Sequence, residues 1–387
     1  MKTVLISAGD ASGELHAAAL VEQLRRRNPE VRVLGLGGPA MEKAGVELIV
    51  PQRELAVGLG VEVLRDLRRI VGAWRRMTRA LAETKPDLVI LVDSPDFNLP
   101  LAGRVKRAGI PVLYYVSPQV WAWRRGRIRR IAKRVDRLAV IFPFEPAVYA
   151  GTGLAVDFVG HPLVDRLQPV GAGPERTAAR HALGLEPGRP YVLLLPGSRR
   201  NEVRSTLPLQ LAAARALHAR DPRVGFVVAV APSIERSSID AAIAATTLPA
   251  LLDLTVLEGR THEAMRAADV ALAKPGTVTL EVALVGTPFV VAARVNRFTA
   301  FLMRRLVRVA SYTMPNLIAG RAIVPEFLQE AADPARVADA LLSLLRGPER
   351  ALQLAAFAEV RAALGAGGAA ARAAAIAEEM MRGAARS

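Results

Sequence analysis

Short apolar runs alternate with stretches of helical periodicity along the first half of this chain. The apolar runs at 3–9, 31–38, 86–97, 110–118, 137–144 and 156–162 are typical of buried strands. Residues 12–27, between the first two runs, have helical spacing, with Ser12 as the expected N-cap. Strands that alternate with helices predict βαβ units and a mainly parallel sheet.

The same alternation restarts after a Pro/Gly-rich stretch at 168–190. Strands are predicted at 191–199, 224–232, 254–260, 268–276 and 287–294, and an Ala-rich helical tail covers 349–386. We therefore expect an α/β protein with two Rossmann-like domains, at 1–167 and 168–348, whose parallel sheets face an interdomain cleft. For the C-terminal helix at 349–387, packing on the first domain and exchange with a second subunit both stay open.

Composition narrows the function classes. The absence of cysteine excludes disulfides and thiolate metal sites and favours a cytoplasmic protein. The longest uncharged run, 108–123, contains two prolines and is shorter than the roughly twenty residues that span a bilayer, so no transmembrane helix is expected. The net charge of +16 predicts an anionic partner; nucleic acid, an anionic leaflet and phosphorylated substrates all fit.

Two basic segments refine this expectation. Residues 124–137 hold eight basic side chains, so that some of them are solvated and can meet phosphates. A helical projection of 61–82 places arginines on most of the circumference and an apolar face on the rest. Such a helix either lies on an anionic leaflet or packs its apolar face on the sheet. The candidate membrane-facing residues are Val63, Leu64, Leu67, Val71 and Trp74.

The turns that follow the predicted second-half strands are candidates for a nucleotide-sugar site, because ligands bind beyond the carboxyl ends of parallel strands. Small residues there let backbone N–H groups approach a phosphate, and an arginine pairs with it. A glutamate one helical turn further on can accept both ribose hydroxyls. No Walker-type Lys-Ser/Thr follows, which favours a nucleotide sugar over ATP hydrolysis. The candidates are Gly197, Ser198, Arg199, Gly259, Gly276, Thr277 and Glu281.

Several longer strings resemble the lipid-A-disaccharide synthase family. They are "SAGDASGE" (7–14), "DSPDFN" (93–98), "YVSPQVWAWRRGR" (115–127), "FPFE" (142–145), "VGHPL" (159–163), "LLPGSRRNEV" (194–203), "GTVTLE" (276–281) and "PNLIAGRAIVPEFLQE" (315–330). They occur in the family's order over residues 1–345. The resemblance implies a GT-B glycosyltransferase that moves 2,3-diacylglucosamine from UDP to the 6-hydroxyl of 2,3-diacylglucosamine 1-phosphate, with inversion and without a metal or cofactor.

The resemblance also implies roles for individual residues. Asp96 is the expected general base, with Asp93 as its competitor; alternatively, both carboxylates cap their turn. His161 and Asn316 are expected near the UDP-sugar, although a structural histidine and a loop cap are the simpler readings of each. The first domain is expected to bind the acceptor and face the membrane, and the second to bind the donor. The expected acceptor-binding residues are Ser12, Glu14, Trp121, Trp123 and Arg124.

The chain departs from the family pattern at two places. The first-loop acids are exchanged, as Asp10 and Glu14, and Pro275 stands where the family usually has serine. Acyl substrates favour a cytoplasmic protein that is peripheral on the cytoplasmic face of the inner membrane; a homodimer stays open, and nucleic acid is not expected. The alternatives are a UDP-sugar epimerase, a transferase with another acceptor, and a non-catalytic basic membrane or nucleic-acid binder.

Overall fold

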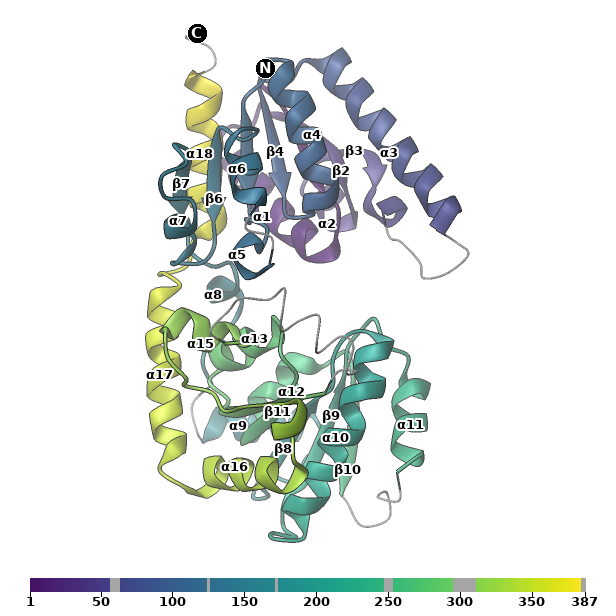
Figure 1. Cartoon of the computed structure of the whole chain (residues 1–387), viewed down its shortest axis with the longest axis vertical. Coiled ribbons are helices and arrows are strands. Elements are labelled where there is room, and N and C mark those ends of the chain that lie inside the picture. The colour runs from purple at the N-terminus through teal and green to yellow at the C-terminus, as the bar shows by residue number, and fades with distance from the viewer. Residues whose placement is uncertain (56–62, 124–125, 171–172, 247–252, 295–310, 384–387) are drawn as a thin grey trace. The chain divides into compact units, whose positions relative to one another are not determined.

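The computed structural model describes residues 1–55, 63–123, 126–170, 173–246, 253–294 and 311–383, without the side chains of 63–67, 122 and 123. The chain forms two compact units. Unit 1 comprises Met1–Pro162 and Leu364–Ser387, and unit 2 comprises Leu163–Ala363. Each described sheet is parallel throughout, with the order β3-β2-β1-β4-β5-β6-β7 in unit 1 and β10-β9-β8-β11-β12-β13 in unit 2 (Figure 1).

The strands of unit 1 carry its core. They are β1 (Thr3–Ala8), β2 (Arg32–Gly37), β3 (Glu47–Pro51), β4 (Leu88–Val92), β5 (Val112–Tyr115), β6 (Arg137–Val140) and β7 (Ala155–Phe158). All five residues of β4 are buried, as expected for a central strand covered on both faces. The helices are α1 (Ala11–Arg27), α2 (Pro39–Lys43), α3 (Val63–Thr84), α4 (Pro95–Arg107), α5 (Val120–Trp123), α6 (Arg127–Ala132), α7 (Glu145–Val148) and α18 (Ala369–Gly383).

Unit 2 repeats the design. Its strands are β8 (Tyr191–Leu195), β9 (Gly225–Val230), β10 (Leu254–Glu258), β11 (Val270–Ala273), β12 (Phe289–Ala293) and β13 (Glu326–Leu328). Its helices are α8 (Leu163–Arg166), α9 (Pro174–Ala182), α10 (Arg200–His218), α11 (Arg236–Ala244), α12 (Thr261–Ala267), α13 (Val278–Val285), α15 (Met314–Ala319), α16 (Pro334–Arg346) and α17 (Glu349–Ala363). The second core lies where α10 and α16 cover this sheet.

The Ala-rich tail is not one helix but two, α17 in unit 2 and α18 in unit 1. Small alanine side chains let α18 pack closely on α1 (Figure 1), and Arg27 donates to Glu378 at 2.9 Å. Arg372 of α18 donates to the Val159 carbonyl at 2.9 Å. These contacts fasten the end of the chain to unit 1.

The structure corrects two details of the sequence reading. The strands β3 and β13 were not predicted; β3 has only three consecutive apolar residues between Glu47 and Pro51, and β13 spans only three residues, so neither gives a clear apolar run. The N-cap of α1 is Asp10 rather than Ser12, because the Asp10 carboxylate accepts from the Gly13 N–H at 2.8 Å. Ser12 lies inside the helix and is exposed.

Candidate functional site

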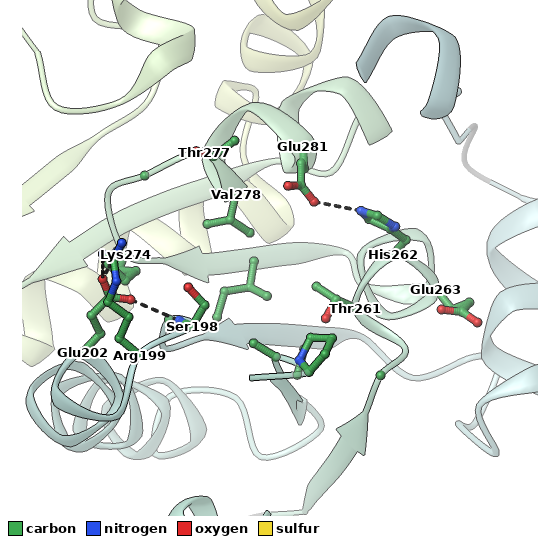
Figure 2. Close-up of a pocket in the computed structure, with 17 residues that line it drawn as sticks. Ser198, Arg199, Glu202, Thr261, His262, Glu263, Lys274, Thr277, Val278 and Glu281 are labelled. Carbon is green, nitrogen blue, oxygen red and sulfur yellow. Dashed lines mark hydrogen bonds and ion pairs between the residues drawn. The ribbon is translucent and has the colours of Figure 1, made fainter. Parts of the chain in front are cut away.

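A cavity of about 580 Å³ opens in unit 2 at the carboxyl ends of β8, β9 and β11. The turns after β8 and β11 and the start of α12 supply its walls (Figure 2). The residues predicted from those turns all line it: Gly197, Ser198, Arg199, Gly259, Gly276, Thr277 and Glu281. The structure thus brings the predicted nucleotide-sugar residues of three separate turns into one cavity.

The first wall is the turn between β8 and α10. Gly197 has a φ of +127°, a conformation that strongly favours glycine. A Cβ at this position would lie 2.7 Å from the Glu202 carboxylate and 2.9 Å from Lys274 Cδ. A side chain at position 197 would clash with both groups. Glycine therefore leaves room for the Glu202 carboxylate and the Lys274 side chain to pair beside the backbone of this turn.

The second wall is the turn from β11 into α13. Gly276 has a φ of +146°, and its carbonyl accepts from Thr279 Oγ1 at 2.7 Å. Thr277 is the N-cap residue of α13 but makes no capping bond with its side chain, which is exposed. The N–H groups of Thr279 and Leu280 donate to the Gly276 and Thr277 carbonyls within the turn, so what this turn offers an anion is chiefly the positive end of the helix dipole.

The third wall joins α12 to α13. His262 Nε2 lies 2.8 Å from Glu281 Oε2, and this pair occupies one end of the cavity (Figure 2). The hydrogen bond to Glu281 raises the pKa of His262 above its ordinary value. Glu281 is thereby held in one orientation, with its carboxylate facing the cavity.

The other end of the cavity holds a cluster around Glu202 (Figure 2). Its carboxylate lies 3.2 Å from Lys274 Nζ and 3.0 Å from Arg199 Nη1, and it accepts from the Ser198 N–H at 3.1 Å. Glu202, Lys274 and His262 were missed at the sequence level. Glu202 stands three residues after Arg199 and Lys274 directly before Pro275, so proximity to the predicted turns was the available signal.

In unit 1, Asp93 directly follows β4 and has an unusual backbone conformation. Asp93 and Ser94 have φ values of 43° and 44°, in the left-handed region. The buried amide of Asn98 holds this turn by donating to the Asp93 carbonyl at 2.9 Å and to the Val92 carbonyl at 3.0 Å. Left-handed conformations at non-glycine residues cost energy and cluster at functional sites.

The Asp93 carboxyl has a perturbed pKa. Burial and, next, the negative charge of Asp10 raise it to about 6. Asp10 is fixed in place because it caps α1 and accepts from Ser94 Oγ at 2.7 Å. An Asp with a pKa near neutrality can take up and release a proton under working conditions.

Asp96 has a different environment. It stands in the first turn of α4, its side chain is 80% exposed, and it accepts from Arg127 at 2.7 Å. It borders a cavity of about 330 Å³ that is partly lined by Leu55, Ile70 and Phe97. Asp96 is thus placed to contact a ligand with apolar parts, although its charge is already paired.

Glu14 does not face an open site. It is buried, it accepts from the Ala40 N–H at 2.7 Å, and it also pairs with the Gln52 side chain. Its carboxylate therefore anchors the start of α2 within unit 1, which corrects the expectation of a free acceptor-binding group. Ser12 is exposed on the first turn of α1.

Trp121 packs inside an aromatic cluster. Its ring meets Phe144 edge-on at 5.0 Å between centroids, and Phe144 stacks on Phe142 at 5.5 Å. Beside this cluster, burial raises the pKa of Glu145 to about 8, and the carboxylate accepts from the N–H groups of Ile141 and Phe142. The Trp121 ring is buried and supports this loop of unit 1. The Trp123 side chain and Arg124 lie outside the described residues.

The described part of α3 packs on unit 1. Ala73, Met77 and Leu81 are buried in its core, and the Trp74 ring meets Phe97 edge-on at 5.8 Å. Trp74 is half-buried, so these contacts favour the alternative that this part of α3 packs on the sheet, whereas Val71 is 40% exposed. The side chains of Val63, Leu64 and Leu67 lie outside the described residues. Among the helices of the described ranges, none has the length and apolar character needed to cross a bilayer.

Comparison with known proteins identifies the family. The sequence model of the lipid-A-disaccharide synthetase family matches residues 4–379. The lipid-A-disaccharide synthase of Anaeromyxobacter sp. (strain K) is 44% identical over 379 residues, which cover 98% of this chain and 96% of the relative. That of Myxococcus xanthus (strain DK1622) is 42% identical over 372 residues, covering 96% and 95%.

The chain belongs to the lipid-A-disaccharide synthetase family. Membership confirms the predicted family and the predicted enzyme class, a UDP-sugar glycosyltransferase of lipid A biosynthesis. Solved structures confirm the GT-B fold class. The calicheamicin glycosyltransferase CalG4 has a TM-score of 0.62 at 16% identity, covering 100% of this chain and 99% of its own. Acinetobacter baumannii MurG has a TM-score of 0.59 at 17% identity, covering 98% and 100%.

Two predicted donor residues of this lipid-A-disaccharide synthetase family member, Asn316 and His161, are not among the residues that line the unit 2 cavity. Asn316 is not among the residues that line the unit 2 cavity: its amide donates to the Val324 carbonyl and Glu326, and accepts from the N–H groups of Ile323 and Val324. These contacts use its full hydrogen-bonding capacity. Asn316 therefore acts as a cap of its loop. Glu326 holds the same loop, because its carboxylate accepts from the Thr313 N–H at 2.9 Å.

His161 belongs to unit 1, not to the unit that holds this cavity. It is buried beside Phe142, with 5.1 Å between ring centroids. Burial and, next, His16 lower the pKa of His161 to about 3, so its imidazole is neutral under ordinary conditions. The unit 2 cavity is lined by a different histidine, His262.

Proposed function

We propose that the protein transfers 2,3-diacylglucosamine from UDP to the 6-hydroxyl of 2,3-diacylglucosamine 1-phosphate, with inversion at the anomeric carbon. The products are UDP and the β(1→6) tetra-acyl disaccharide 1-phosphate. The observation that carries this proposal is the unit 2 cavity, which combines two glycine turns, a helix N-terminus and a fixed glutamate. Family membership supplies the lipid substrates.

The donor is expected to lie along the cavity, with its ribose beside Glu281 and its diphosphate beside Arg199. Glu281 accepts the ribose hydroxyls, since its carboxylate is held by His262. Arg199, the Ser198 N–H and the first turn of α13 bind the diphosphate. These groups stabilise the negative charge that develops on UDP as the anomeric C–O bond breaks.

We infer that Asp93 is the general base. The base takes the proton from the acceptor 6-hydroxyl while that oxygen attacks the anomeric carbon, and a pKa near the working pH suits this step. The raised pKa of about 6 supports Asp93. Asp96, which the sequence favours, is exposed and paired with Arg127, so it is better suited to binding the acceptor.

Membrane attachment is a separate part of the proposal. The acyl chains of both substrates require access from a bilayer, and Arg129, Arg130 and Lys133 of the α6 region are exposed. We propose that they meet anionic headgroups on the cytoplasmic face of the inner membrane, at about 1 kcal/mol per charge near the surface. Vesicle flotation with and without phosphatidylglycerol tests this part without affecting the proposed reaction.

The activity is tested with both substrates in detergent, following UDP release and the disaccharide by mass spectrometry. Asp93→Asn and Asp96→Asn form a matched pair, because each removes one carboxylate from the same turn. We expect disaccharide from the wild type, loss of at least about 10²-fold in Asp93→Asn, and a smaller loss in Asp96→Asn. The reverse order of losses assigns the base to Asp96. UDP release without disaccharide in the wild type contradicts the proposed acceptor and leaves an epimerase or another acceptor.

A further inference from the structure

Lys274 occupies a singular position in unit 2. The chain has lysines only at residues 2, 43, 85, 106, 133 and 274, so Lys274 is the sole lysine in Leu163–Ala363. It follows the last residue of β11 and lines the cavity, with 22% of its side chain exposed. Its ammonium group points toward the turn that follows β8 (Figure 2).

The partner of Lys274 is Glu202, which holds three donors at once. Its carboxylate pairs with Lys274 Nζ at 3.2 Å and Arg199 Nη1 at 3.0 Å, and it accepts from the Ser198 N–H at 3.1 Å. An ammonium group, a guanidinium group and a loop N–H are the donors with which proteins bind phosphates. A carboxylate of the chain itself therefore sits among donors suited to phosphate oxygens.

Electrostatics keep this carboxylate charged. Burial alone would raise the pKa of Glu202, but Lys274, the Ser198 N–H and Arg199 outweigh burial and hold the pKa below its ordinary value. One negative charge faces two positive charges, so the cluster retains a net positive charge. A more highly charged anion can therefore compete for the same donors.

The two glycine turns meet at this cluster. A Cβ on Gly197 would lie 2.9 Å from Lys274 Cδ, and one on Gly276 would lie 3.5 Å from Lys274 Nζ. The Lys274 side chain therefore lies between the backbone of the turn at Gly197 and the backbone of the turn at Gly276. Pro275 has no N–H to donate, and Lys274 gives that turn a cationic donor at this end of the cavity.

We propose that Lys274 binds the diphosphate of the nucleotide donor, and that Glu202 is an internal carboxylate that holds Lys274 and Arg199 until the diphosphate displaces it. This inference rests on the proposed donor site in unit 2. Because the diphosphate takes the place of the Glu202 carboxylate, Lys274 and Arg199 are paired with an anion both before and after the donor binds. The resting cluster is therefore arranged for the ligand before the ligand binds.

Lysine labelling tests the contact in the wild type, independently of turnover. The full chain is acetylated with a limiting amount of an N-hydroxysuccinimide ester, with and without UDP, and each lysine is quantified by mass spectrometry. We expect UDP to slow the acetylation of Lys274 at least several-fold and to leave Lys106, in unit 1, unchanged. Equal acetylation of Lys274 with and without saturating UDP overturns the inference.

Binding by variants separates this inference from the proposed function. Lys274→Met is expected to weaken UDP binding by about tenfold or more, as for a lost hydrogen bond to a charged group, and to leave uridine binding unchanged. Lys106→Met is the matched control. Glu202→Gln is expected to bind UDP several-fold more tightly, because no carboxylate has to be displaced.

The outcomes are distinguishable. If the wild type binds neither UDP nor uridine, the proposed donor site itself is wrong. If the wild type binds UDP and Lys274→Met binds it equally well, only the role of Lys274 is wrong. A loss of UDP affinity in Glu202→Gln equal to that in Lys274→Met contradicts the displaced-carboxylate role. If Lys274→Met fails to fold, labelling of the wild type still decides.

Discussion

The imidazole of His262 lies 2.8 Å from the carboxylate of Glu281, across the cavity wall formed by α12 and α13. This contact joins the residue we assign to the ribose with a group that titrates near neutral pH. The hydrogen bond with Glu281 raises the pKa of His262. The pair therefore stabilises the folded protein fully below the ordinary pKa of histidine, and this contribution is lost as the pH rises through the folded pKa.

The titration of His262 can be followed by NMR of histidine side chains, since the chain has five. We expect the midpoint of His262 to lie above the ordinary value and to fall toward it in Glu281→Gln. His161 is the internal control: its pKa of about 3 predicts no titration above pH 5 in either protein. An unchanged His262 midpoint in Glu281→Gln would show that the pair does not form in solution.

The assignment of Asp93 predicts a pH dependence that Asp10 controls. The base must be ionised, so kcat/KM is expected to rise with pH through about 6, the raised pKa of Asp93. Burial and the Asp10 charge raise that pKa, so Asp10→Asn is expected to move the rising limb to lower pH. Asp87→Asn is the control, because Asp87 pairs with Lys2 at the opposite end of β4. An unmoved limb in Asp10→Asn contradicts the assignment.

Asp269 predicts a large effect on the stability of unit 2. Its carboxylate pairs with the buried guanidinium of Arg180 at 2.5 Å and accepts from the Tyr191 N–H at 2.8 Å. Asp269→Ala leaves that guanidinium buried without its counter-charge, which costs about 3 kcal/mol. Urea unfolding measures the loss. Glu235→Ala removes an exposed partner of Arg200 and should change the free energy of unfolding by less than about 0.5 kcal/mol.

The central strands and the donor turns could be predicted from the sequence, because both are local features. The run "YVLLL" of β8 is apolar throughout, and the turn after it begins with glycine, serine and arginine. The edge strands β3 and β13 could not, because the apolar part of β3 is only three residues long before Pro51 and β13 has only three residues in all. Contacts between residues far apart in the sequence could not be predicted either, because they depend on how the chain folds. Glu14 meets Ala40 and Gln52, and nothing near Glu14 in the sequence reveals either partner.

The acidic turn of unit 1 shows the same limit. The string "DSPDF" indicated two candidate carboxylates, but it contained no information on which one is buried. The perturbing charge is Asp10, more than eighty residues earlier, brought close by the pairing of β1 with β4. The pKa of Asp93 is therefore a property of the fold and not of the motif.

The linkage in the product tests the central claim most directly. The wild-type protein is incubated with UDP-2,3-diacylglucosamine and 2,3-diacylglucosamine 1-phosphate, and the purified product is examined by NMR. A β-linked disaccharide joined at the 6-position, formed in equal amount with UDP, is the result we predict. An α linkage, another attachment position, or release of UDP with no disaccharide would contradict the proposed reaction.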